Sequence, residues 1–188
     1  MRVTPMSAPR ARTGLVTTVL CTSLAVACVA PGPSQEQEAR EAELQVRLLM
    51  AAWESADPAL LEELFWPDAL YDDFPNQHTY QGVVEITGYV TALHDWADVV
   101  TFDVGQVHVT ESGAVAEWTF SAVQARPIGS QVPVVTGREV ISNGVTIIEL
   151  ERGRIRRAAD YMDTRPIALQ LGGRLEMPGG SVIELDGR

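Results

Sequence analysis

Two aspartates, Asp160 and Asp73, lie where a pocket carboxyl group could do acid–base chemistry. Asp160 falls in a predicted strand, in which alternate residues share a face, so Ala158 and Met162 point the same way as Asp160. The small alanines at 158 and 159 leave room beside its carboxyl group. In a pocket such a side chain can transfer protons. The alternative is an aspartate that faces solvent near the end of its strand.

Aromatic side chains provide the apolar surroundings that such a carboxyl group needs. Trp118 and Phe120 share one face of a predicted strand, where they either fill the core or line a ligand cavity. An apolar wall disfavours the charged form of a carboxyl group and raises its pKa toward neutral pH. The pocket residues that we expect near the two aspartates are Tyr71, Trp118, Phe120, Trp53 and Met162.

The composition limits the classes of partner. The 188 residues include 14 basic and 25 acidic side chains, for a net charge of −11. Nucleic acids and anionic membrane surfaces are bound mainly through Lys and Arg, so neither suits this chain. The three histidines, His78, His94 and His108, have no spacing typical of a metal site. We therefore expect no nucleic-acid partner, no metal and no cofactor.

Residues 1–27 have the pattern of a secretory signal peptide, with early arginines, an apolar run and no acidic residue before Glu36. The residues before Cys28 resemble a lipobox, at which bacterial lipoproteins are cleaved and lipidated. We expect a membrane-anchored lipoprotein attached only through a lipid on Cys28, with residues 28–40 as a flexible tether. Plain secretion and an uncleaved anchor are the alternatives.

Helices come first in the mature chain and strands follow, an order typical of an α+β fold. Helical spacing of apolar residues and the start signal Asp57-Pro58 predict helices, and alternating stretches predict strands. The expected helices span residues 36–56, 58–65 and 82–98. The expected strands span 69–74, 101–109, 114–125 and 134–150, with a bulge at Asn143-Gly144, before the strand of Asp160. Residues 75–81 read as a polar loop, 41–172 as one domain, and 173–188 as a loosely packed tail.

Several short motifs connect this order of elements with a known superfamily. They are Ala114-Val-Ala-Glu-Trp-Thr-Phe120, Thr136-Gly-Arg138, Gly144-Val-Thr-Ile-Ile148, and Gly153-Arg-Ile followed by Asp160-Tyr-Met-Asp163. Over residues 44–172 the chain resembles the nuclear-transport-factor-2-like superfamily, and within it the SnoaL-like branch of polyketide cyclases. The resemblance implies a cone-shaped, curved antiparallel sheet wrapped around N-terminal helices, an apolar pocket inside it, and homodimers formed through the sheet.

Residues can be carried over from two enzyme types of this superfamily. The catalytic aspartate of limonene-epoxide hydrolases matches Asp160, and their water-positioning Tyr and Asn match Tyr71 and Asp73, but their Arg and second Asp fall on Trp118 and Phe120. The proton-shuttling aspartate of ketosteroid isomerases matches Asp73. Their two oxyanion donors fall on Leu49 and Thr146. Both resemblances imply that the partner groups of these mechanisms are missing.

SnoaL-type cyclases require fewer catalytic groups, because a single aspartate acts as acid and base in a pocket that orients the substrate. Asp160 resembles that aspartate. Two hypotheses follow: an exported protein whose pocket binds a small hydrophobic molecule without catalysis, or an enzyme that uses Asp160, and with it Asp73, on such a molecule. Export and the missing partner groups favour the first hypothesis, and the two candidate aspartates favour the second.

Overall fold

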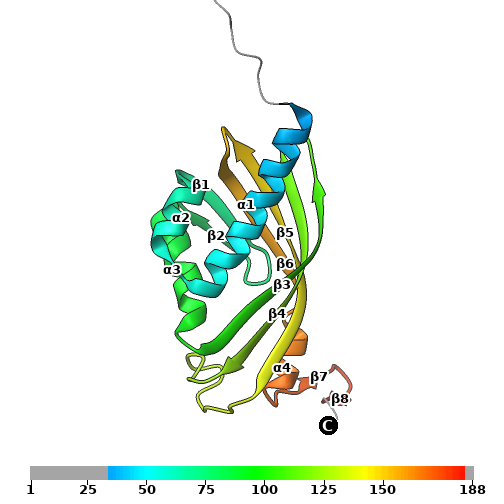
Figure 1. Cartoon of the computed structure of the whole chain (residues 1–188). Coiled ribbons are helices and arrows are strands. Elements are labelled where there is room, and N and C mark those ends of the chain that lie inside the picture. Colours follow the sequence, from blue (N-terminus) through cyan, green and yellow to red (C-terminus); the bar gives the residue numbers. More distant parts are fainter. Residues whose placement is uncertain (1–33, 185–188) are drawn as a thin grey trace, which may run out of the picture. The chain divides into compact units, whose positions relative to one another are not determined.

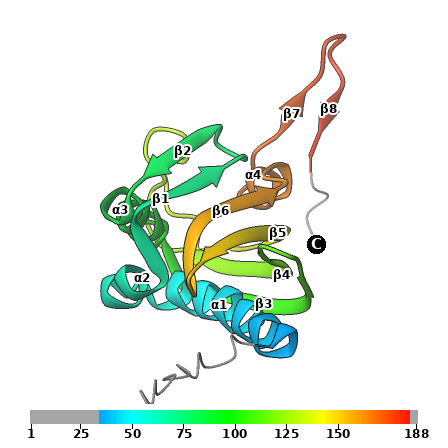
Figure 2. The same cartoon turned by 90° about the horizontal axis from the view of Figure 1, so that it is seen from above.

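The computed structural model describes residues 34–184, in which N-terminal helices pack against a curved sheet (Figures 1 and 2). The fold is α+β, and the elements that the sequence predicts occur in the predicted order, with β2 (His78–Gln81) and α4 (Arg165–Gln170) in addition. The predicted signal peptide at 1–27 and the predicted lipidation site Cys28 lie outside the described residues.

Three helices precede most of the sheet: α1 (Gln35–Ser55), α2 (Pro58–Leu64) and α3 (Val83–His94). Ser34 and Gln37 form a capping box that fixes the start of α1, so the end of the segment predicted as a tether, residues 28–40, is helical instead. Asp57 caps α2, whose first residue is Pro58, as the sequence predicts.

Six strands form the main sheet, in the order β2-β1-β6-β5-β4-β3. Their bounds are β1 (Phe65–Asp73), β2 (His78–Gln81), β3 (Ala97–Val109), β4 (Gly113–Gln124), β5 (Glu139–Glu151) and β6 (Arg154–Met162). The residues predicted as a polar loop, 75–81, therefore contain the short strand β2. No register shift occurs at Asn143-Gly144, where a bulge was expected; β5 and β6 instead shift register between Glu149 and Leu150.

The sheet is mixed, which corrects the expectation of an antiparallel sheet. β1 pairs with β2 in an antiparallel hairpin, and its other edge pairs with β6 in parallel. The reason is topological, because β6 enters from its hairpin with β5 in the same direction as β1. This parallel pair brings residues almost ninety positions apart in the chain onto neighbouring strands.

The core lies between α1 and the concave face of the sheet (Figure 2). α1 buries Val46, Leu49, Met50 and Trp53 there. From the sheet, alternate residues of β4 point into the same core, among them Trp118 and Phe120. The N-terminal helices thus cover the face of the sheet that carries the candidate residues.

After β6 the chain forms helix α4 (Arg165–Gln170), which the sequence analysis missed, and a small hairpin of β7 (Leu175–Glu176) and β8 (Val182–Ile183). The Gln170 side chain accepts from the backbone N–H of Ile141 and donates to its carbonyl oxygen, which attaches α4 to β5. The segment predicted as a loosely packed tail, residues 173–188, contains this hairpin of two short strands. Among residues 34–184, no helix is long and apolar enough to cross a membrane.

Candidate functional site

Three polar residues lie side by side on neighbouring strands. The parallel pairing of β1 with β6 sets Asp73 beside Asp160, and the antiparallel pairing of β5 with β6 sets Thr146 beside Asp160. Residues at paired positions share a face of the sheet. All three are buried, so the sheet itself assembles a polar group inside the cone.

Two hydroxyl groups hold the Asp160 carboxylate. Tyr71 on β1 donates to Oδ2 at 2.6 Å, and Thr146 on β5 donates to Oδ1 at 2.5 Å. These are the distances of charge-assisted O–H···O⁻ hydrogen bonds. Each carboxylate oxygen therefore has one donor inside the protein.

Each of these two hydroxyl oxygens accepts a hydrogen bond from an indole N–H. Trp53 on α1 donates to the Tyr71 oxygen at 3.0 Å, and Trp118 on β4 donates to the Thr146 oxygen at 2.8 Å. We call these five residues, Trp53, Tyr71, Asp160, Thr146 and Trp118, the Asp160 network. Because each indole N–H can only donate, each hydroxyl proton is directed at the carboxylate.

Gly144 makes space for one arm of the Asp160 network. It is the β5 partner of Trp118, and a Cβ atom at this position would overlap the indole ring. The glycine therefore allows Trp118 to reach across β5, and the hydrogen bond between Trp118 and Thr146 depends on it.

Burial dominates the electrostatics of this site. The pKa of Asp160 is raised to about 6, mainly by desolvation. The hydrogen bonds from Thr146 and Tyr71 oppose the rise, and the nearby Asp73 adds a smaller increase. Burial, and then the charge of Asp160, raise the pKa of Tyr71 well above its usual range. Tyr71 is therefore a donor, and Asp160 is a group that changes charge near neutral pH.

Asp73, the second candidate, is buried, and its carboxylate accepts hydrogen bonds from the nearby turn residue Asn76. Its Oδ1 accepts from the backbone N–H of Asn76 at 3.2 Å, and its Oδ2 accepts from the Asn76 side chain at 2.7 Å. These contacts fix the turn between β1 and β2. Asp73 thus lies next to Asp160, but it does not line the cavity that Asp160 lines.

A cavity of about 490 Å³ lies inside the cone, within the usual range for small-molecule sites. Of the expected pocket residues, Trp53, Trp118, Phe120 and Met162 line it together with Asp160. Tyr71 does not; it lies behind Asp160 in the Asp160 network. The sequence analysis did not identify the other lining residues as part of a pocket. They are Asn76, Tyr80, Tyr89, Ala92, Leu93, Trp96, Phe102, Ile128, Gln131 and Val132, with Thr164, Ile167, Ala168 and Leu171 from α4 and its flanks.

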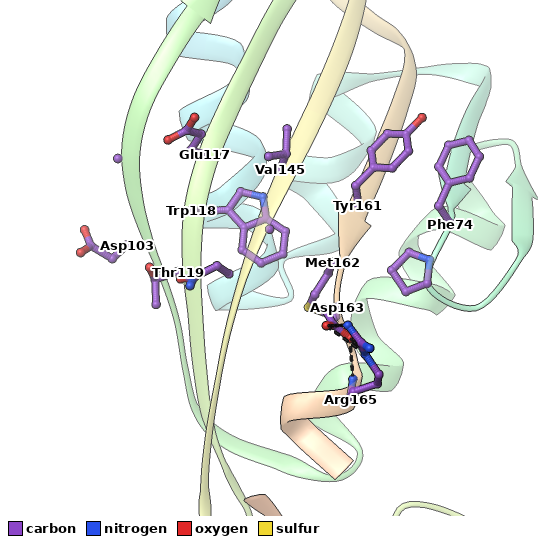
Figure 3. Close-up of a pocket in the computed structure, with 14 residues that line it drawn as sticks. Phe74, Asp103, Glu117, Trp118, Thr119, Val145, Tyr161, Met162, Asp163 and Arg165 are labelled. Carbon is purple, nitrogen blue, oxygen red and sulfur yellow. Dashed lines mark hydrogen bonds and ion pairs between the residues drawn. The ribbon is translucent and has the colours of Figure 1, made fainter. Parts of the chain in front are cut away.

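A second hollow of about 860 Å³ lies mostly on the opposite, outward face of the sheet (Figure 3). Phe74 and Tyr161 stack at its edge with ring centroids 4.4 Å apart. The Arg165 guanidinium lowers the pKa of Asp163 to about 2. The acidic side chains that line this second hollow, such as Glu117, are exposed, and among the described residues no pair of buried hydroxyl groups donates to them as Tyr71 and Thr146 do to Asp160. The cone interior is therefore the candidate site.

The sequence matches the model of the SnoaL-like domain over residues 46–158, more than half of the chain. The chain belongs to the SnoaL-like domain family. A comparison with curated proteins found no match.

Solved structures similar to this SnoaL-like protein share its fold at low sequence identity. TsrD from Streptomyces laurentii is 23% identical, with a TM-score of 0.62 over 71% of this chain and 96% of TsrD. A candidate SnoaL-like polyketide cyclase from Jannaschia sp. CCS1 is 15% identical (TM-score 0.65; 74% and 97% covered). A protein of ketosteroid-isomerase-like fold from Catenulispora acidiphila, in complex with trimethylamine, is 18% identical (TM-score 0.58; 69% and 92% covered).

Replacing Tyr71 with phenylalanine is expected to raise the pKa of Asp160 above its value of about 6, because Tyr71 donates to the charged form of the carboxyl group. A carboxyl-carbon NMR titration measures this pKa directly. Tyr161→Phe, at an exposed position, is the matched control. An unchanged pKa of Asp160 in Tyr71→Phe would contradict the assigned role of the hydroxyl.

Proposed function

We propose that this SnoaL-like protein binds a small, mainly apolar molecule inside the cone, with a polar group of that molecule against Asp160. One observation carries the proposal: Asp160 is the single charged side chain that lines the 490 Å³ cavity within the described part of the chain. The rest of the lining is mainly apolar, with Asn76, Gln131 and Thr164 as further polar side chains. Such a cavity selects ligands by shape and orients them through its few polar groups. The complex of the Catenulispora acidiphila protein with trimethylamine also supports a small-molecule site on this fold.

A second candidate function is SnoaL-type acid–base catalysis by Asp160. The pKa of about 6 favours it, because a general base works best when its pKa is near the working pH. The NMR titration described above also tests this candidate. If Asp160 titrates near the ordinary value for aspartate, of about 3.9, the cavity has no poised base and catalysis by Asp160 fails.

The residues required by the epoxide-hydrolase and ketosteroid-isomerase mechanisms are not present at the matching positions of this chain. The positions of the hydrolase Arg and Asp are occupied by Trp118 and Phe120, which line the cavity as aromatic walls. The isomerase donor positions are Leu49, which is buried in the core, and Thr146, which donates to Asp160. We therefore propose neither epoxide hydrolysis nor ketosteroid isomerisation.

Export, a lipid anchor on Cys28 and a homodimer belong to the same proposal. The first two rest on the pattern of residues 1–28. The outward sheet face, with exposed Tyr161 and Phe74, is the surface through which the superfamily resemblance implies dimers. In this proposal the cavity opens to the cell exterior and not to the cytoplasm.

Replacing Met162 with tryptophan is expected to reduce the affinity for an apolar ligand at least about tenfold, because the larger side chain occupies the cavity. The probe is N-phenyl-1-naphthylamine, whose fluorescence rises in apolar surroundings. Val84→Trp adds the same ring at an exposed position on α3 and serves as the control. Equal binding by both variants, or no binding by the wild-type protein, would refute the proposed site.

A further inference from the structure

Two carboxyl groups lie inside the cone without a basic partner. Asp73 is 1% exposed and Asp160 is 8% exposed, and they occupy paired positions on β1 and β6. The ion pairs among residues 34–184 all involve other acidic side chains, such as Asp72 with Arg157 and Asp98 with Arg126. A buried charge without a counter-charge is costly, so a cation bound beside Asp160 would stabilise its charged form.

The cavity wall is also of the type that attracts cations. In the described part of the chain, seven aromatic side chains line it: Trp53, Tyr80, Tyr89, Trp96, Phe102, Trp118 and Phe120. They pack around one another, with Tyr80 stacked on Tyr89 at 4.2 Å and Trp53 edge-on to Tyr89 at 5.0 Å between ring centroids. The faces of aromatic rings carry negative potential and attract ammonium groups.

Among residues 34–184, no Arg, Lys or His lines the cavity. An anionic ligand would meet Asp160 without a compensating charge. A bare metal ion fits poorly as well, since the described residues contain no cluster of three or more acidic, His or Cys side chains, and hard cations require several oxygen ligands. A cation that carries its own apolar groups suits both the Asp160 carboxylate and the aromatic side chains that line the cavity.

We propose that the cavity binds an organic ammonium ion, a quaternary ammonium or protonated amine with apolar substituents, with Asp160 as its counter-ion and the aromatic side chains as its walls. This inference rests on the proposed small-molecule site and names the ligand class of that site. The charge of the ligand, in addition to its shape, then determines selectivity.

The test compares choline with 3,3-dimethylbutan-1-ol, in which a carbon atom replaces the charged nitrogen. Isothermal titration at pH 7.5 is expected to give at least about tenfold tighter binding of choline. Asp160→Asn is expected to remove most of this preference, while the affinity for the neutral alcohol changes less than about twofold. Asp103→Asn, which removes an exposed charge on the outward face, should leave both affinities unchanged.

The outcomes separate this inference from the proposed function. Equal affinities, tighter binding of the neutral alcohol, or a choline preference that survives Asp160→Asn would each overturn the ammonium site. If N-phenyl-1-naphthylamine binds and choline does not, the small-molecule site stands and the ligand class is wrong. If none of the three probes binds, both proposals fail. Circular dichroism of each variant verifies that it is folded.

Discussion

Asp160→Asn is expected to gain stability relative to the wild-type protein as the pH rises, by about 3 kcal/mol over the full titration. The pKa of Asp160 is about 6 in the folded protein, against an ordinary value of 3.8 for aspartate. The stability contributed by its protonated form is therefore fully present below pH 3.8 and is lost as the pH rises through about 6. Asparagine does not titrate, so the variant keeps this stability.

Urea unfolding at several pH values measures this effect. Between pH 4.5 and 8 the difference in the free energy of unfolding, variant minus wild type, should grow by about 2 kcal/mol. The other acidic residues are common to both proteins and largely cancel. Asp103→Asn controls for the loss of one negative charge. A difference that stays constant with pH, or that shrinks as the pH rises, would show that burial does not raise the pKa of Asp160.

Gly144→Ala is expected to destabilise the protein by about 2–4 kcal/mol, because the new methyl group would overlap the Trp118 indole. The indole must move, and its hydrogen bond to Thr146 is then lost. Urea unfolding followed by tryptophan fluorescence measures both the stability and the change around Trp118.

Gly88→Ala is the matched control for this substitution. Gly88 lies inside α3 with no atom near the position of the added methyl group. Alanine is favoured over glycine within a helix, so this variant should be more stable than wild type by about 0.5–1 kcal/mol. The two glycine substitutions thus have opposite expected signs. A loss of less than about 1 kcal/mol in Gly144→Ala would mean that the indole position is not tightly constrained.

Local patterns in the sequence were sufficient to predict the helix starts and the strand of Asp160, but they left open whether Asp160 faces a pocket or solvent. The Asp57-Pro58 cap and the extended pattern around Asp160 are local signals, and the structure contains the cap and the strand. Burial does not alternate there, because Ala158, Ala159 and Asp160 are all buried. Helix α4 was missed because its six residues are too few for a helical period to be recognised.

The neighbours of Asp160 could not be predicted, because alternation gives the residues of one strand that share a face but not their partners across the sheet. A regular hairpin extended from the Glu151–Arg154 pair would set Val145 opposite Asp160. The register shift between Glu149 and Leu150 sets Thr146 there instead. Considered as a single residue, Thr146 looked like a lost oxyanion donor, whereas in the structure it donates to Asp160. The parallel pairing that brings Tyr71 and Asp73 to Asp160 is equally non-local.

The parallel pairing of β1 with β6 also affects the order in which the chain can fold. Tyr71 and Asp160 are 89 residues apart in the sequence, and every strand between them pairs with a sequence neighbour. During synthesis from the N-terminus, the β1–β2 hairpin must wait for β6 before it can join the sheet. Closing so long a loop loses chain entropy before the contacts between β1 and β6 form and offset this loss. The step is therefore expected to be slow. The site around Asp160 is therefore completed late, when the last strand of the main sheet arrives.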